Sequence, residues 1–152
     1  MSANPRNALV FPTVEWFQAL QELVNADPDF RRLGSIDTSM GVKVGPKIFI
    51  ITFEAFECSK VREGTEYDLI EVDFFLEMSE ADWQDLIRNT KENGGADLKH
   101  TLNTLDLTSQ DGLSKNATGD QLRADLFFRV NQSLQHFFDS SAKLDTVFEP
   151  VT

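Results

Sequence analysis

The longest apolar run in the chain covers residues 47–58 and reads KIFIITFEAFEC. Its β-branched and aromatic residues are typical of a strand, and the run is far too short to cross a membrane as a helix. Because side chains alternate across a strand, Phe49, Ile51 and Phe53 would share an apolar face, while Glu54 would lie on a mixed face. The pattern therefore predicts a long central strand with one covered face.

Residues 67–78 alternate more regularly and predict a second long strand. Phe74 and Leu76 would point to one side of it, and acidic residues such as Glu71 to the other. Residues 36–44 are a further expected strand. Together the strands predict an antiparallel sheet with one face packed on helices, so the question for function is whether a ligand also lies between sheet and helices.

Helical spacing of apolar residues predicts the helices. Thr13 is the expected N-cap of a helix that runs to about Asn25, and Ser79 caps another that ends at Asn93-Gly94-Gly95. A last helix is expected from Thr118 or Asp120 to about Ser140. Its apolar stripe contains Leu122, Leu126, Val130, Leu134 and Phe137.

The chain is expected to form one domain. It has 152 residues and neither an internal repeat nor a linker that would divide it. The single domain would cover 1–152, with a core over about 14–140 and flexible ends at 1–12 and 144–152.

The net charge of −11 disfavours negatively charged partners. An acidic surface repels phosphate backbones and anionic lipid, so we expect no nucleic-acid binding and no stable membrane insertion. Cys58 is the only cysteine, which excludes an internal disulfide. The N-terminal residues lack the apolar core of a signal peptide and the C-terminal residues lack a prenylation cysteine, so a cytoplasmic location is expected.

Sequence motifs of catalysis are absent: the chain has no glycine-rich phosphate loop, no nucleophile elbow, no HExxH and no CxxC. Asp97 and His100 lie three positions apart on an expected helix. They could form an acid–base pair or a solvated face, and they do not fill a metal site. Glu54 could be a buried acid with a raised pKa, or face solvent. The sequence predicts no enzyme activity, no metal and no cofactor.

Two residues depart from the pattern of the last helix. Arg123 falls inside the apolar arc, where its forked donors could hold a ligand carboxylate or extend to solvent. Phe128 falls outside the arc and could close a pocket mouth, meet a partner or simply be exposed. The chain has 13 phenylalanines, which suit a bulky core or an apolar pocket equally.

The order of these elements carries a resemblance. The first amphipathic helix ends in Asn25-Ala-Asp-Pro-Asp-Phe30, three strands follow, and a Ser-capped helix then holds Trp83 and Leu86. A Gly119-Asp120 pair opens the last helix. In this order, and in its D-P-x-F-like segment, the chain resembles the sterol carrier protein type 2 family.

The resemblance spans about residues 14–140. The polar stretch 112–119, the Asn93-Gly94-Gly95 stop and the segment 100–107 depart from the family pattern, which suggests a divergent bacterial branch. The resemblance implies an α+β fold with a twisted, mainly antiparallel sheet of about five strands and helices covering one face. It also implies a hydrophobic tunnel for a sterol, fatty acid or acyl-CoA, and no chemistry.

The expected function is non-catalytic binding or carrying of an apolar small molecule, such as a lipid, fatty acyl chain or sterol, in a pocket between the sheet and the last helix. An accessory protein that supports a partner enzyme, with no ligand of its own, is the alternative; its contact would use the acidic surface, Phe128 and residues 93–119. An α+β enzyme using Glu54, or Asp97 with His100, is a third possibility. The candidate ligand-binding residues are Phe49, Ile51, Phe53, Phe74, Leu76, Arg123, Leu126, Val130 and Phe137.

Overall fold

The structure is a computed structural model that describes residues 8–33 and 37–150. The strands are β1 (Ala8–Phe11), β2 (Thr38–Val44), β3 (Lys47–Glu54), β4 (Glu57–Glu63), β5 (Phe74–Met78), β6 (Ser114–Lys115) and β7 (Asp145–Phe148). The helices are α1 (Val14–Asn25), α2 (Pro28–Arg32), α3 (Asp68–Glu71), α4 (Glu80–Asn93), α5 (Leu102–Thr108), α6 (Gln121–Ala124), α7 (Leu126–Arg129), α8 (Asn131–Asp139) and the 3-10 helix η2 (Ser140–Lys143).

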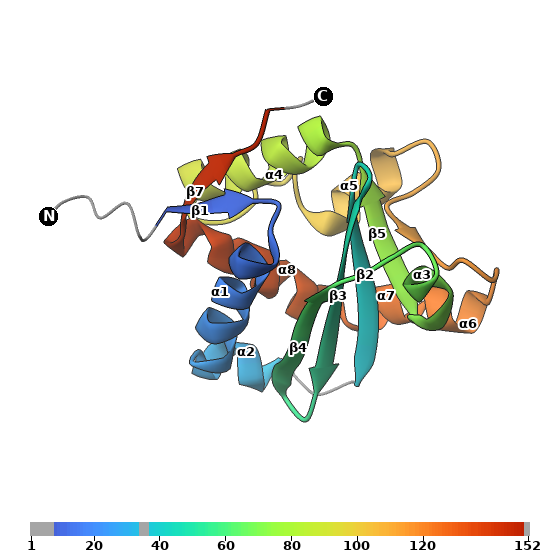
Figure 1. Cartoon of the computed structure of the whole chain (residues 1–152). Helices are drawn as coiled ribbons and strands as arrows, with labels where there is room; N and C mark the ends of the chain where they lie inside the picture. Colours follow the sequence, from blue (N-terminus) through green and yellow to red (C-terminus); the bar gives the residue numbers. More distant parts are fainter. Residues whose placement is uncertain (1–7, 34–36, 151–152) are drawn as a thin grey trace, which may run out of the picture.

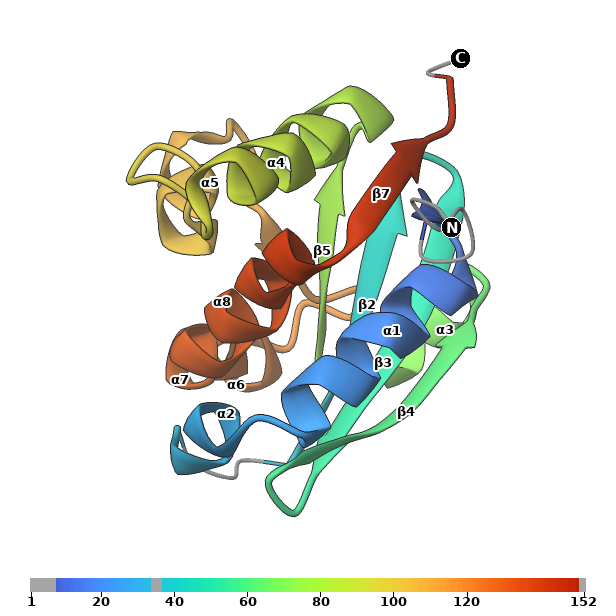
Figure 2. The same ribbon diagram turned by 90° about the vertical axis from the view of Figure 1, so that its left-hand side faces the viewer.

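The main sheet has five strands in the order β4-β3-β2-β5-β6 (Figure 1). The pairs β2–β3, β3–β4 and β5–β6 are antiparallel, and β2–β5 is parallel. The chain therefore has an α+β fold with an open, mostly antiparallel sheet, which confirms the expected fold class. Helices α1 and α8 lie over one face of this sheet (Figure 2).

The main core fills the space between that face and the helices, and aromatic rings dominate it. Phe17 of α1 lies 4.8 Å from Phe49 of β3 between ring centroids, and Trp83 of α4 lies 5.5 Å from Phe138 of α8. The indole N–H of Trp83 donates to the carbonyl of Lys43 at 2.8 Å. Because buried polar groups are costly when unpaired, this bond lets the indole lie fully inside the core.

Local capping chemistry explains the two helices that the sequence located correctly. The Thr13 hydroxyl accepts the N–H of Trp16 and begins α1. The Ser79 hydroxyl accepts the N–H of Asp82 and begins α4, which ends where Gly94 adopts a φ of 72°. Side-chain caps and a left-handed terminal residue are encoded by single residues, so sequence alone could place them.

The single long strand expected over 47–58 is wrong. The chain reverses at Ala55 and Phe56, and residues 57–63 return as β4, paired with β3. The turn was missed because it contains neither glycine nor asparagine, the usual signals of a two-residue hairpin loop.

The long strand expected over 67–78 is also wrong, because its first part is the short helix α3 and only Phe74–Met78 is a strand. The Asp68 carboxylate accepts the Thr65 N–H at 2.8 Å and bonds Arg62, which closes a turn before α3. Ile70, within the range of the expected strand, is 48% exposed. Helix α3 instead covers part of the opposite face of the sheet, over a small cluster of Ile48, Ile50, Leu69, Val72 and Phe75.

The continuous last helix is wrong too. The structure divides it into α6, α7 and α8, with breaks at Asp125 and Val130. Leu122, expected in the apolar stripe, is 83% exposed, whereas Phe127 and Phe137 are fully buried. Each break turns the following segment, so a single 100° wheel cannot describe which residues face the core.

Both ends that the sequence predicts to be flexible contain a strand. Residues 8–11 and 145–148 form β1 and β7, which pair in parallel as a separate ribbon. The indole N–H of Trp16 donates to the Thr146 hydroxyl at 3.0 Å and attaches this ribbon to α1. The remaining end residues, 1–7 and 151–152, lie outside the described part of the chain. Within the part that is described, no helix combines the length and the apolar character needed to span a bilayer.

His100 fastens the loop before α5 to α4. Its Nδ1 lies 2.7 Å from Asp97 and its Nε2 lies 2.8 Å from Asp85. The bond to Asp97 raises the pKa of His100 above its ordinary value, with the Asp85 bond adding to the rise. In turn the bonds from His100 and Asn89 lower the pKa of Asp97 to about 2. His100, Asp97 and Asp85 therefore form a clamp at the surface that charge-assisted hydrogen bonds hold together.

This clamp predicts a pH-dependent stability. The pKa of His100 is raised in the folded state, so its contribution is fully present below the unfolded value of about 6.5. The contribution is lost as the pH rises through the raised folded pKa. Urea unfolding should show the largest gap between the wild type and His100→Gln near pH 6, and a smaller gap at pH 9.

Lys99→Gln is the matched control, because Lys99 is the neighbouring residue and only its backbone N–H bonds Asp97. It should follow the wild type at both pH values. A gap for His100→Gln that does not change with pH would contradict the clamp.

Candidate functional site

A cavity of about 170 Å³ lies where the β3–β4 hairpin meets the helices. Its walls come from α2, the start of β2, the hairpin, the end of α7 and the start of α8. The lining residues are Phe30, Leu33, Thr38, Phe53, Glu54, Phe56, Glu57, Arg129, Val130, Ser133 and Leu134.

The floor of the cavity is apolar and rigid. Phe30, Phe53, Val130 and Leu134 are buried there, with exposures of 7% or less. Phe53 also packs edge-on against Phe137 with a ring separation of 5.5 Å. Side chains that are buried and ring-packed hold the shape of the floor, as expected of a preformed apolar pocket.

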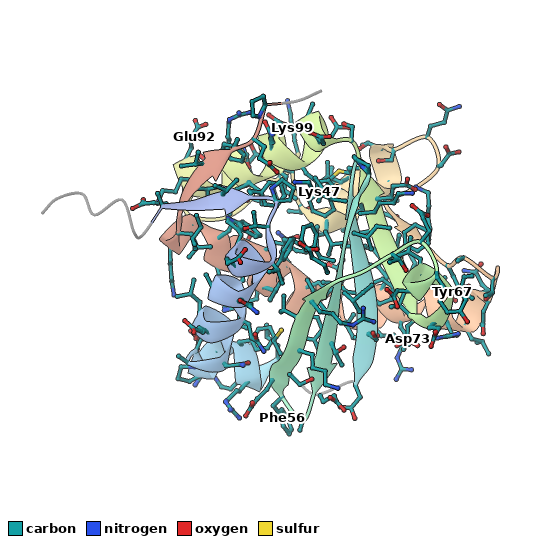
Figure 3. All side chains as sticks on the ribbon, in the orientation of Figure 1. Lys47, Phe56, Tyr67, Asp73, Glu92 and Lys99 are labelled. Carbon is teal, nitrogen blue, oxygen red and sulfur yellow. The ribbon has the colours of Figure 1, made fainter. Side chains whose placement is uncertain are left out.

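Phe56 stands at the mouth of the cavity, on the tip of the hairpin (Figure 3). Glu54 pairs directly with Glu57, so Ala55 and Phe56 alone make the turn, with φ values of 51° and 69°. A residue with a Cβ in this left-handed region costs roughly 1–2 kcal/mol. Strained backbone collects at functional sites, and here the strain holds a 47% exposed phenyl ring over an apolar cavity.

Neighbouring polar groups hold the turn in place. The Ala55 N–H donates to the Asp37 carboxylate at 3.1 Å. Arg31 of α2 pairs with Glu57 at 2.7 Å, and the Ser59 hydroxyl donates to Glu54 at 2.8 Å. These contacts engage both carboxylates of the mouth, Glu57 with α2 and Glu54 with β4.

The helical wall is tied to α2 by a further contact. Nε2 of His136 on α8 donates to Asp27 at 2.7 Å, and Asp27 also caps α2 by accepting the Asp29 N–H at 2.9 Å. The hydrogen bond from His136 lowers the pKa of the Asp27 carboxyl below its ordinary value. The α2 and α8 walls of the cavity are thereby kept at a fixed separation.

The residues that the sequence singled out as ligand-binding are only partly together. Phe53 and Val130 line the cavity. Leu126 is partly buried against the main core. The others of the apolar set lie inside that core in contact with other side chains; they are Phe49, Ile51, Phe74, Leu76 and Phe137.

Arg123 lies away from the cavity lining. Its Nε donates to Asp73 at 3.3 Å and its terminal nitrogen to the carbonyl of Glu71 at 2.7 Å. The other oxygen of Asp73 accepts the hydroxyl of Thr38, a buried cavity residue, at 2.8 Å. Arg123 thus reaches the cavity wall only indirectly, through Asp73.

Sequence reasoning missed most of the lining: Phe30, Leu33, Phe56, Arg129 and Ser133 were not candidates. Phe56 had one available signal. It lies near the end of the 47–58 run, which is longer than most strands, and that length could have indicated a turn inside the run. The others come from separate elements whose packing no local pattern specifies.

The candidate catalytic groups lie apart from one another. Glu54 is exposed at the cavity mouth, whereas Asp97 and His100 belong to the clamp beside α4. Burial raises the pKa of the Cys58 thiol to about 12, so it stays protonated and a poor nucleophile. Across residues 8–33 and 37–150, no group of three or more His, Cys, Asp or Glu side chains is arranged to hold a metal ion.

Relief of the turn strain is directly testable. Ala55→Gly should raise the free energy of unfolding by about 1 kcal/mol, because glycine adopts positive φ without a Cβ penalty. Ala81→Gly, on the exposed first turn of α4, should lower it by about 0.5–1 kcal/mol. Urea unfolding measures both changes, and the dependence of the unfolding free energy on urea concentration should keep the same slope. Destabilisation by both variants would rule out a left-handed turn.

Arg123→Ala separates a structural role from ligand contact. Loss of the bonds to Asp73 and Glu71 should lower the free energy of unfolding by about 0.5–1 kcal/mol. Binding of a ring-bearing probe, followed by NMR titration, should stay unchanged. Weaker binding at unchanged stability would instead make Arg123 a ligand contact.

The chain was compared with family models, with curated proteins and with solved structures, and none of the comparisons gave a match. The resemblance to the sterol carrier protein type 2 family therefore stays a prediction from the order of its elements.

Proposed function

We propose that this protein binds an apolar small molecule without chemical turnover, and that the cavity under Phe56 is the binding site. The observation that carries the proposal is the strained turn that presents Phe56 over a floor of buried apolar side chains. Positive φ at Phe56 costs stability whatever its ring contacts, and strain of this kind collects at functional sites. A ligand between Phe56 and the floor would offset part of that cost by burying the ring.

The volume limits what part of a ligand the cavity holds. An engineered protein cavity of about 150 Å³ accommodates benzene, and the cavity here measures about 170 Å³. Pockets for drug-sized ligands are larger, roughly 300–1,000 Å³. The proposed ligand therefore places one ring or a short branched chain inside, and a whole sterol exceeds the available space.

The expected affinity of such a group is low. Burying about 150 Å² of apolar surface at about 25 cal/mol per Å² gives about 4 kcal/mol. That free energy corresponds to a Kd of about 1 mM before association costs are subtracted. A ligand that stays bound therefore needs a polar anchor besides its apolar group.

We also propose that this binding takes place in the cytoplasm. The single cysteine is unpaired and buried, which suits a reducing compartment.

A second candidate function, support of a partner protein, draws on a different surface. Phe128 is 55% exposed and borders a hollow of about 310 Å³ that Asp106, Asp120 and Asp125 also line. A basic side chain of a partner would be attracted there. This function does not use the cavity under Phe56, so a variant that fills that cavity would leave it intact.

Filling the cavity tests the main proposal. Ser133 lines the cavity from the first turn of α8, and Gln132 beside it is exposed and outside the lining. Ser133→Phe should remove binding of phenylacetamide, an uncharged ring-bearing probe, in an NMR titration. Gln132→Phe should bind the probe like the wild type.

Both variants should keep the cooperative unfolding of the wild type, since each changed position is at least partly accessible. Equal binding by Ser133→Phe and wild type, or no binding of the probe by the wild type, would refute the proposed site.

A further inference from the structure

We infer that the ligand of this cavity is an amphipathic organic anion, whose ring-sized apolar part lies under Phe56 and whose carboxylate is bound by Arg129 at the end of α7. The inference rests on the proposed function and extends it from an apolar group to a charged ligand class. The carboxylate would be the polar anchor that the ligand needs, because the small apolar floor alone binds weakly.

Arg129 is the cation available at the mouth. It is the last residue of α7, is exposed and lines the cavity. Among the described residues it takes part in none of the ion pairs. Arg31, also near the mouth, is occupied by Glu57 at 2.7 Å. A forked guanidinium without a protein acceptor suits a carboxylate, which it can bind through two parallel bonds.

The start of α8 adds partial positive charge on the same side. Val130 occupies its N-cap position with φ −107° and ψ 9°, and it has no side-chain oxygen to accept the first N–H groups. Ser133, in that first turn, lines the cavity. Next to Val130, the side-chain nitrogen of Asn131 is buried and has no hydrogen-bond partner within the described residues. Of these groups, the first turn of α8 reaches the cavity lining, through Ser133, and its N–H groups reinforce the attraction that Arg129 exerts on an anion.

The negative groups of the mouth lie on the hairpin and are already engaged. Glu57 pairs with Arg31, and Glu54 accepts the Ser59 hydroxyl. The mouth therefore has a hairpin side with neutralised or bonded carboxylates and an α7–α8 side with an available cation. A ligand with one apolar end and one anionic end matches this division, with its ring between Phe53 and Phe56 and its carboxylate toward Arg129.

The charge of the protein surface helps to discriminate between anionic and uncharged ligands. With a net charge of −11, most of the surface repels a small anion. Binding of an anion consequently requires a local cation, and removing that cation should be felt by the charged probe alone. Lys99 provides a matched control, because its substitution changes the net charge equally and Figure 3 shows it at the opposite end of the molecule from Phe56.

The experiment compares two probes of the same shape, phenylacetate and its uncharged isostere phenylacetamide, by NMR titration at pH 7. The wild type should bind phenylacetate about fivefold more tightly, the size of one accessible charge-assisted contact. Arg129→Gln should remove this preference and leave the Kd of phenylacetamide unchanged. Lys99→Gln should keep the preference.

The outcomes distinguish failure of the anion assignment from failure of the proposed function. If both probes bind the wild type equally, the anion assignment is overturned while the proposed site stands. If the preference survives in Arg129→Gln, the assignment of the carboxylate to Arg129 is overturned. If phenethylamine, the cationic analogue, binds more tightly than phenylacetate, the assignment is likewise overturned. If no probe binds the wild type, the proposed function falls together with it.

Discussion

The two-residue reversal at Ala55 and Phe56 is the constraint on which the sheet and the cavity both depend. A two-residue loop joins antiparallel strands best when its backbone twist matches theirs, and here positive φ at both central residues provides that match. The reversal gives β3 its second antiparallel neighbour. It also places Phe56 at the tip of the hairpin, over the cavity.

The walls around that ring are held by contacts between elements distant in the sequence. His136 joins α8 to the cap of α2, and Arg31 joins α2 to the hairpin. The buried aromatic core packs behind the floor, with Phe137 against Phe53. An apolar surface of this size binds weakly when it acts alone, so the proposed ligand would need the polar groups at the mouth to stay bound. On that proposal, the division of charge between the hairpin and α7–α8 would favour an amphipathic anion.

The parts of the fold that sequence could predict are those encoded by neighbouring residues. Thr13 and Ser79 identify the starts of α1 and α4 because a capping hydroxyl bonds an N–H only three residues away. The pairing of β1 with β7 could not be predicted, since it joins segments more than a hundred residues apart and neither strand has a strong pattern. The last helix was misread at Asp125 and Val130, where no glycine or proline marks the breaks.

Less of the candidate site could be predicted, because its residues come from elements that are distant in the sequence. Phe53 and Val130 were found through the apolar faces of one strand and one helix, and both line the cavity. Composition could not distinguish them from Phe49 or Phe74, because pocket lining and core use the same residue types. Phe56 and Arg129 acquire their importance only from where the hairpin and the α7–α8 junction meet.

The most direct test of this account is a crystal structure of the protein soaked with phenylacetamide. The account predicts positive φ at Ala55 and Phe56, with the probe's ring between Phe56 and the floor formed by Phe53 and Leu134. A probe bound elsewhere, or a turn that directs Phe56 away from an empty cavity, would contradict the claim that this strained turn builds the binding site.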